Sequence, residues 1–131
     1  MNATKWIVGA GFAALAAVAA YAQIPGITRT AVQEQDLGSL PGRQVVVAHV
    51  GFAPGAIVPM HTHAGEEVGY VVEGELELQV QGQPTRIVKA GEGFVVPANT
   101  PHLGKNVGSG KAVVLATYIH EKGKPVTTMV K

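Results

Sequence analysis

The chain has 131 residues, of which 15% are charged, a formal net charge of +1 and no cysteine. This length has room for one ordinary domain. The nearly balanced charge excludes the electrostatic footprint of a nucleic-acid-binding protein, and the lack of cysteine excludes disulfides and thiolate metal sites.

The first 22 residues differ in kind from the remainder. Lys5 is their only charged side chain, an apolar run extends from Trp6 to Ala20, and Ala20-Tyr21-Ala22 has the small–x–small form of a cleavage site. We interpret residues 1–22 as a helical secretory signal peptide cleaved before Gln23, so that the protein is exported, periplasmic or secreted. The alternatives are an uncleaved membrane anchor, although the run is shorter than the ~20 residues that span a bilayer, and a buried core helix. No stable membrane insertion is expected after cleavage.

Residues 23–42 are expected to form an extended lead-in with at most an edge strand at Ile27–Val32. From residue 43 the chain changes to short β-rich runs separated by glycine and proline, which predicts a barrel domain over residues 43–121 and a tail over 122–131. The predicted strands are Arg43–Phe52, Ile57–Thr62, Glu67–Glu73, Glu75–Gln81, Thr85–Lys89, Phe94–Val96 and Lys111–His120.

The run Glu75–Gln81 shows the strand pattern most clearly, because apolar and polar residues alternate along ELELQVQ. Such alternation indicates a strand with one buried face and one face in water. No stretch after residue 22 has helical periodicity. The fold class is therefore predicted to be all-β, as a sandwich or barrel.

Two histidines stand one residue apart at His61 and His63, and Glu66 and Glu67 follow at once. Side chains alternate faces along a strand, so the two imidazoles point to the same side of the sheet. A carboxylate from the next strand can then join them around one cation. Nitrogen and oxygen ligands of this kind suit a divalent ion of zinc, iron, manganese, nickel or copper.

The spacing of these residues resembles the two sequence motifs of the cupin family. The first motif is matched by Gly55, His61, His63, Glu67 and Gly74, and the second by Gly91, Pro97, His102 and Asn106. One position departs from the family pattern, because Asn99 stands where glycine is usual. Asparagine tolerates the left-handed backbone that this turn requires.

The resemblance implies a single jelly-roll barrel that holds a divalent metal ion through His61, His63, Glu67 and His102. The motif spacing favours Glu67 over Glu66 as the carboxylate ligand, and Glu66 is expected to remain in water at the turn. Val46, Val71, Phe94 and Val96 are expected to provide an apolar lining.

Other residues are given plainer roles. His49 is expected to be a pocket or core histidine, His120 to face solvent, and Tyr118 to point into the barrel, where core packing is its default role. Asn106 is expected to serve strand hydrogen bonding or to anchor a metal-bound imidazole. Arg43, Arg86 and Lys105 are expected to be ordinary surface charges.

We predict an exported divalent-metal-binding cupin that acts as a metal-dependent, dioxygenase-like oxidoreductase on a small organic molecule. The alternatives are a non-catalytic binder of a small ligand or metal, a metal that only stabilises the barrel, and a cupin isomerase or decarboxylase. Val68, Tyr70 and Val72 give one strand apolar residues on both faces, so a homodimer is expected to cover them.

Overall fold

The computed structural model describes residues 24–131, and the predicted signal peptide lies outside these residues. The described chain contains ten strands: β1 (Ile27–Asp36), β2 (Arg43–Phe52), β3 (Ile57–Thr62), β4 (Gly65–Glu73), β5 (Glu75–Val80), β6 (Arg86–Lys89), β7 (Gly93–Val96), β8 (His102–Asn106), β9 (Ala112–Glu121) and β10 (Thr128–Met129). No helix occurs between residues 24 and 131, which confirms the all-β prediction. Accordingly, the described part of the chain offers no helix long and apolar enough to cross a bilayer.

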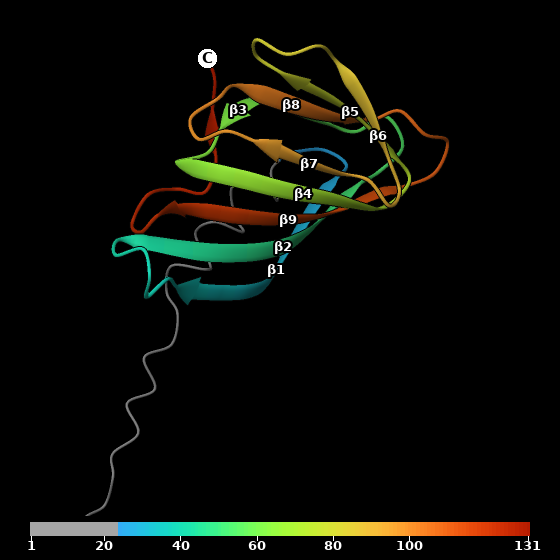
Figure 1. Ribbon diagram of the computed structural model, residues 1–131. Helices are drawn as coiled ribbons and strands as arrows, with labels where there is room; N and C mark the ends of the chain where they lie inside the picture. The colour runs from blue at the N-terminus through green and yellow to red at the C-terminus, as the bar shows by residue number, and fades with distance from the viewer. Residues whose placement is uncertain (1–23) are drawn as a thin grey trace, which may run out of the picture.

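The strands form two five-stranded antiparallel sheets that face each other (Figure 1). One sheet has the order β1-β2-β9-β4-β7 and the other β10-β3-β8-β5-β6. Consecutive strands β3 and β4 lie in different sheets, so the short connection between them crosses from one wall of the barrel to the other. The residues around this crossing are therefore close to both walls.

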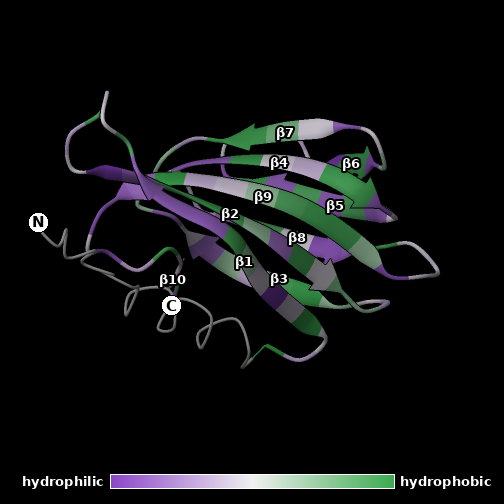
Figure 2. Ribbon diagram, turned by 90° about the horizontal axis from the view of Figure 1, so that it is seen from below, coloured by the Kyte–Doolittle hydropathy of each residue, from purple (hydrophilic) through white to green (hydrophobic). Residues whose placement is uncertain are grey.

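The core lies between the sheets because the strands alternate buried and less buried residues. β9 shows this most regularly: Ala112, Val114, Ala116, Tyr118 and His120 point inward, and the intervening residues are half-buried. In Figure 2 the front sheet carries long hydrophobic stretches on β2 and β9, whereas β1 passes from a hydrophobic start to a hydrophilic end. β1 thus protects the edge of this sheet with polar residues.

Two backbone positions explain why the motif residues are needed. Gly74 has a φ of 80°, and a Cβ there would lie 2.6 Å from the Lys111 carbonyl oxygen, so a side chain would collide with the backbone at the start of β9. Asn99 has a φ of 57°, as predicted for the residue that replaces glycine. Its backbone N–H donates a hydrogen bond of 2.9 Å to the His63 carbonyl, which holds the loop before β8 against the end of β3.

Three sequence interpretations were wrong. His120 was expected to face solvent, but it lies on the inward row of β9 and is only 3% exposed. His49 was expected in the core or pocket, but it is exposed because its neighbours Ala48 and Val50 occupy the inward row of β2. β1 also extends to Asp36 instead of ending at Val32, since residues 33–36 continue to pair with β2 after a bulge.

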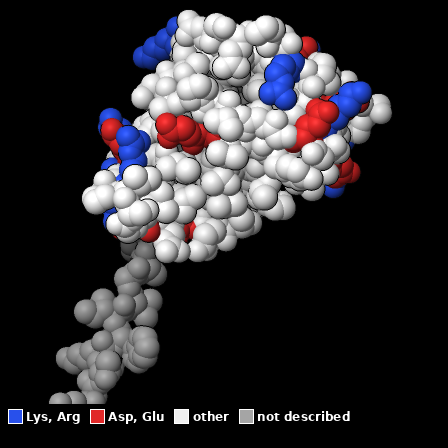
Figure 3. All heavy atoms as spheres, viewed as in Figure 1, with Lys and Arg blue, Asp and Glu red and all other residues white. Residues whose placement is uncertain are grey.

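The face shown in Figure 3 carries isolated positive and negative side chains on a broad uncharged surface. No basic stripe of the kind that binds a phosphate backbone is visible there.

Candidate metal centre

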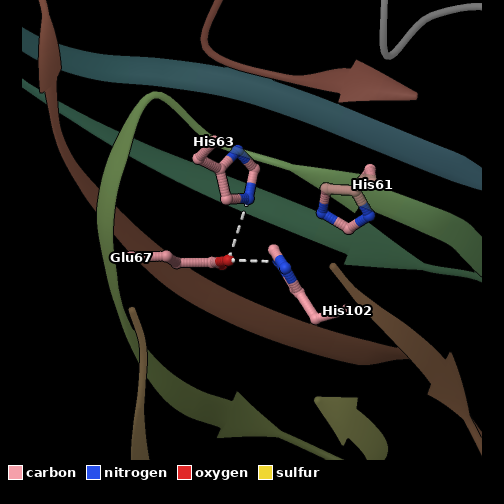
Figure 4. A group of neighbouring side chains, drawn as sticks. All are labelled: His61, His63, Glu67 and His102. Atoms are coloured by element: carbon pink, nitrogen blue, oxygen red, sulfur yellow. Dashed lines mark hydrogen bonds and ion pairs between the residues drawn. The ribbon is translucent and has the colours of Figure 1, made fainter. Parts of the chain in front are cut away.

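The structure brings together the four residues predicted as metal ligands. His61 lies near the end of β3, His63 follows that strand, Glu67 lies on β4 and His102 opens β8. His61 and His102 are register partners across the β3–β8 pair. One potential ligand atom from each of the four residues lies within 4.8 Å of the others, and all four side chains are buried (Figure 4).

Strand alternation decides which of the two glutamates enters this cluster. Glu67 shares the inward row of β4 with Gly65, Gly69 and Val71, whereas Glu66 is exposed on the outer row. The structure therefore places Glu67 beside the histidines and Glu66 in water.

Each imidazole is oriented by a backbone carbonyl. Nδ1 of His61 donates to Pro59 O at 2.7 Å, Nδ1 of His63 to Val126 O at 2.6 Å and Nδ1 of His102 to Thr100 O at 2.8 Å. A carbonyl oxygen accepts only, so each Nδ1 carries the proton. A neutral ring in this tautomer presents a lone pair at Nε2, which is the arrangement found when a second hydrogen bond prepares a histidine to bind a metal.

The carboxylate of Glu67 faces two of these Nε2 atoms. Its Oε2 lies 3.0 Å from Nε2 of His63 and 3.0 Å from Nε2 of His102 (Figure 4). Burial by itself raises the pKa of Glu67, but the hydrogen bonds from His102 and His63 outweigh burial and hold the pKa well below its usual range. Glu67 is thus a carboxylate at neutral pH.

His61 is kept neutral for a related reason. Burial lowers its pKa to about 4, and electrostatic repulsion between its charged form and the rings of His102 and His63 adds to this effect. Its ring centroid lies 4.1 Å from that of His102 and 4.8 Å from that of His63. A second proton on the His61 ring is therefore unfavourable, and Nε2 of His61 keeps its lone pair at neutral pH.

These residues fit a divalent metal ion. The Nε2 atoms and an ionised carboxylate oxygen converge on one point, and a divalent cation there would replace the hydrogen bonds of His63 and His102 to Glu67 and bind all four donors. Donors bound about 2.1 Å from one ion lie about 3.0 Å apart when they meet it at right angles. The two 3.0 Å separations to Glu67 Oε2 have this spacing.

A cavity of ≈ 30 Å³ opens beside the cluster. Its twelve lining residues are Val50, Phe52, Val58, His61, Glu67, Leu76, Leu78, Phe94, His102, Gly104, Val114 and Tyr118. All four residues predicted to line the barrel are buried in its core: Phe94 borders the cavity, and Val46, Val71 and Val96 lie in the core around it.

Tyr118 points into the barrel, as predicted, and is 2% exposed. Its ring centroid lies 4.7 Å from that of His63, and the Cζ atom of Arg29 lies 5.2 Å from the centroid of the tyrosine ring. Arg29 is itself buried, so a guanidinium lies beside the Tyr118 ring without lining the cavity. The sequence offered no signal for this, because Arg29 lies in the segment interpreted as a lead-in.

Asn106 has a structural role at the other end of β8. Its side-chain amide donates to the carbonyls of Phe52, Ala53 and Gly110 at 3.1, 3.1 and 2.8 Å, and its Oδ1 accepts from the Gly108 N–H. Asn106 therefore connects neighbouring loops by hydrogen bonds and anchors none of the three imidazoles. Of the two roles expected for it, the first is confirmed.

The residue that sequence reasoning missed is Val126. Its side chain is 4% exposed and joins the core, and its carbonyl orients His63 from 63 positions along the chain. Thr127 Oγ1 also lies 3.4 Å from the same imidazole nitrogen. The segment that follows β9 thus completes the surroundings of the cluster.

The fold and the site together define a class of protein: a small β-barrel with a candidate metal site made of three oriented imidazoles and one carboxylate. Residues 48–118 match the family model of the cupin domain, more than half of the chain. The chain belongs to the cupin family.

The relatives extend this assignment. A germin-like protein, subfamily 2 member 2, from Arabidopsis thaliana is 36% identical over 110 residues, covering 71% of this chain and 50% of the relative. Oxalate oxidase 1 from Hordeum vulgare is 35% identical over 100 residues, covering 68% and 50%. A solved structure of oxalate oxidase in complex with the substrate analogue glycolate matches with a TM-score of 0.63 and 31% identity over 80% of this chain and 55% of that chain. The chain spans about half the length of the curated relatives it matches.

Proposed function

We propose that this cupin is a metal-dependent oxidoreductase that acts on a small organic molecule inside its barrel. His61, His63, Glu67 and His102 are the ligands in this proposal. The observation that carries it is the orientation of the cluster: three buried imidazoles donate through Nδ1 to backbone carbonyls and leave their Nε2 atoms beside an ionised carboxylate.

A bound iron or manganese ion would supply redox chemistry and a Lewis acid to a substrate that shares its coordination sphere. Three imidazoles and one carboxylate leave one or two positions for other ligands when an ion is five- or six-coordinate. The chain's own contribution is to hold the donors in place, to keep His61 neutral and Glu67 ionised, and to surround the reacting groups with apolar side chains such as Phe94 and Leu78. In such an environment electrostatic interactions are stronger than in water.

The relatives favour oxidation over the other chemistries of this ligand set. Three curated relatives at 34–35% identity bear the name oxalate oxidase, and so does the solved structure at 31%. Since the fold alone does not choose a reaction, this likeness supports the class of reaction and leaves the substrate to the residues of the cavity.

The test is oxygen consumption by the purified chain loaded in turn with iron and manganese, across a panel of small organic acids and alcohols. We expect uptake with at least one metal and one substrate, and its loss in Glu67→Gln. A matched control is His49→Ala, which removes an exposed histidine and is expected to change nothing. No uptake by a protein that holds one equivalent of either metal would refute the oxidoreductase proposal.

A second candidate is a non-catalytic cupin that retains a small ligand or a metal ion. It is favoured by the cavity wall, in which Tyr118 is the only side chain outside the four-residue cluster that can exchange a proton. Tight binding of a ligand to the metal-loaded protein without turnover would support this candidate over the first.

We also propose that a second copy of the chain covers the outer face of the sheet β1-β2-β9-β4-β7. Val68, Tyr70, Val72 and Val95 are 43%, 49%, 48% and 58% exposed on this face. Val68 pairs with Val95 and Tyr70 with Leu115, so the apolar side chains are contiguous across three strands. Sedimentation at micromolar concentration is expected to show a dimer that Val68→Glu dissociates, whereas Ile87→Glu on the other sheet does not. A monomeric unmodified chain would overturn the proposal.

Export is proposed on the pattern of residues 1–22 alone. Amino-terminal sequencing of the protein recovered from outside the cytoplasm is expected to begin at Gln23. A mature chain that still starts at Met1 would favour the anchor.

A further inference from the structure

The wall of the cavity beyond the four residues His61, His63, Glu67 and His102 is apolar. Of the twelve lining residues, Tyr118 is the only one outside the cluster with a polar side chain, and the wall that faces it is made of side chains such as Val58, Leu78 and Val114. No lysine, arginine, asparagine or glutamine is among these lining residues.

Neighbouring polar groups do not make up for this. The amide of Asn106 is 1% exposed and is committed to three backbone carbonyls, so it has no hydrogen to offer a ligand. Arg29 contacts the Tyr118 ring and does not line the cavity. A charged group on the far end of a ligand would therefore lie against hydrocarbon, where an ion without a partner is strongly disfavoured.

The size of the cavity limits the ligand further. Each water needs ~10–15 Å³ of such room, so the ≈ 30 Å³ beside the cluster corresponds to two or three waters. The enclosed part of the cavity thus has space for only a few heavy atoms beyond the group that meets the metal.

We propose that the cavity selects small ligands with one metal-binding group at one end and a short apolar remainder, and discriminates against ligands whose far end is charged. The inference rests on the proposed function in one respect, that the four-residue cluster holds a divalent ion. It assigns the specificity to the side chains of the wall, with Leu78 as a central member because it lies two residues from Val80, the register partner of His102.

The experiment compares probe ligands on the full chain loaded with zinc, which is redox-inert and allows binding to be measured without turnover. Calorimetry at neutral pH is performed with formate, acetate, propionate and butyrate, and with succinate, which replaces the terminal methyl group of butyrate by a carboxylate. We expect affinity to rise by about fourfold per added methylene until the cavity is filled. Succinate is expected to bind at least about a hundredfold more weakly than butyrate.

Leu78→Gln adds a hydrogen-bonding group to the wall and is expected to reduce the ratio between butyrate and succinate by at least about tenfold. Leu78→Met is the matched control, because it keeps the wall apolar at similar volume and should leave the ratio unchanged. Should Leu78→Gln not fold, Val114→Thr introduces a hydroxyl with almost no change in shape and tests the same point.

Zinc content is measured on the same samples. Two results would overturn this inference and leave the metal centre intact, provided that the protein holds one equivalent of zinc. Succinate and butyrate could bind equally well, or Leu78→Gln and Val114→Thr could leave the ratio of their affinities unchanged. A chain that folds but takes up no zinc would overturn the metal centre and this inference with it.

Discussion

The C-terminal segment offers the sharpest test of how the cluster is organised. Val126 O accepts a hydrogen bond of 2.6 Å from Nδ1 of His63, and this is the only one of the three carbonyl anchors that comes from a distant part of the chain. Deleting residues 126–131 removes the anchor together with β10. We expect His63 to lose its fixed orientation, because the ring then has no acceptor that holds Nδ1 protonated.

The expected effect is a 10- to 100-fold loss of zinc affinity, the range typical of removing a partner that orients a metal ligand, which corresponds to about 1.4–2.7 kcal/mol. The assay is competition against a chromophoric chelator of known zinc affinity. Thermal unfolding of the metal-free protein is measured alongside, so that a change in stability is not mistaken for a change in the site.

Two control variants separate the carbonyl from the rest of the segment. Deleting residues 128–131 removes the pairing of β10 with Thr62 and His61 but keeps the Val126 carbonyl. Val126→Ala keeps the carbonyl too, and costs about 2 kcal/mol of stability through two lost buried methyl groups. Both are expected to bind zinc within about threefold of the unmodified chain. This change is well below the loss of about 10- to 100-fold expected when the anchor is removed. Equal zinc affinity in the 126–131 deletion, or an equally large loss in Val126→Ala, would refute the reasoning.

Three further predictions concern single side chains. Glu67→Gln is expected to abolish stoichiometric zinc binding in dialysis followed by elemental analysis, whereas Glu66→Gln, which changes an exposed residue, leaves it intact; equal retention by both variants would contradict the assignment. Protonation of His61 alone is expected to cost the metal-free protein about 3 kcal/mol of stability as the pH falls from 6.5 to 4. The pKa of His61 is about 4 in the folded protein and 6.5 in the unfolded chain, so the unfolded chain takes up the proton first. Urea titrations across this pH range, repeated with His61→Gln, should show a shallower loss in the variant, and identical slopes would exclude this cause. Asn99→Ala is expected to cost about 1 kcal/mol in thermal unfolding and Asn99→Gly almost nothing, since the φ of 57° penalises a Cβ; equal melting temperatures for the two variants would contradict this.

The parts of the site that could be predicted from the sequence are those governed by strand alternation and turn chemistry. His61 and His63 stand two apart, Glu67 falls on the inward row of β4, and Asn99 adopts the backbone that glycine usually provides. Each of these depends on contacts within a few residues or on the two-residue period of a strand. They are therefore visible in a short window of sequence.

The parts that could not be predicted depend on which strands become neighbours. β8 begins at His102 and reads HLGKN, which lacks an apolar alternation, and it forms a strand because β3 and β5 pair with it on both sides. His120 looked like a surface residue beside Glu121 and Lys122, yet the register of β9 turns it inward. In the described chain neither of its ring nitrogens has a hydrogen-bond partner, and burial lowers its pKa.

The three carbonyls that orient the imidazoles show the same difference between local and tertiary contacts. His61 and His102 each use the carbonyl two residues earlier, so their tautomers follow from the local chain at Pro59 and Thr100. His63 depends on Val126, which reaches it only after β9 has crossed the sheet. Two ligands are thus oriented by the motifs themselves and the third by tertiary structure. A cation binds most tightly when all three imidazoles point toward it. Metal binding is therefore expected to stabilise the docking of the C-terminal segment, and this docking is expected to strengthen metal binding.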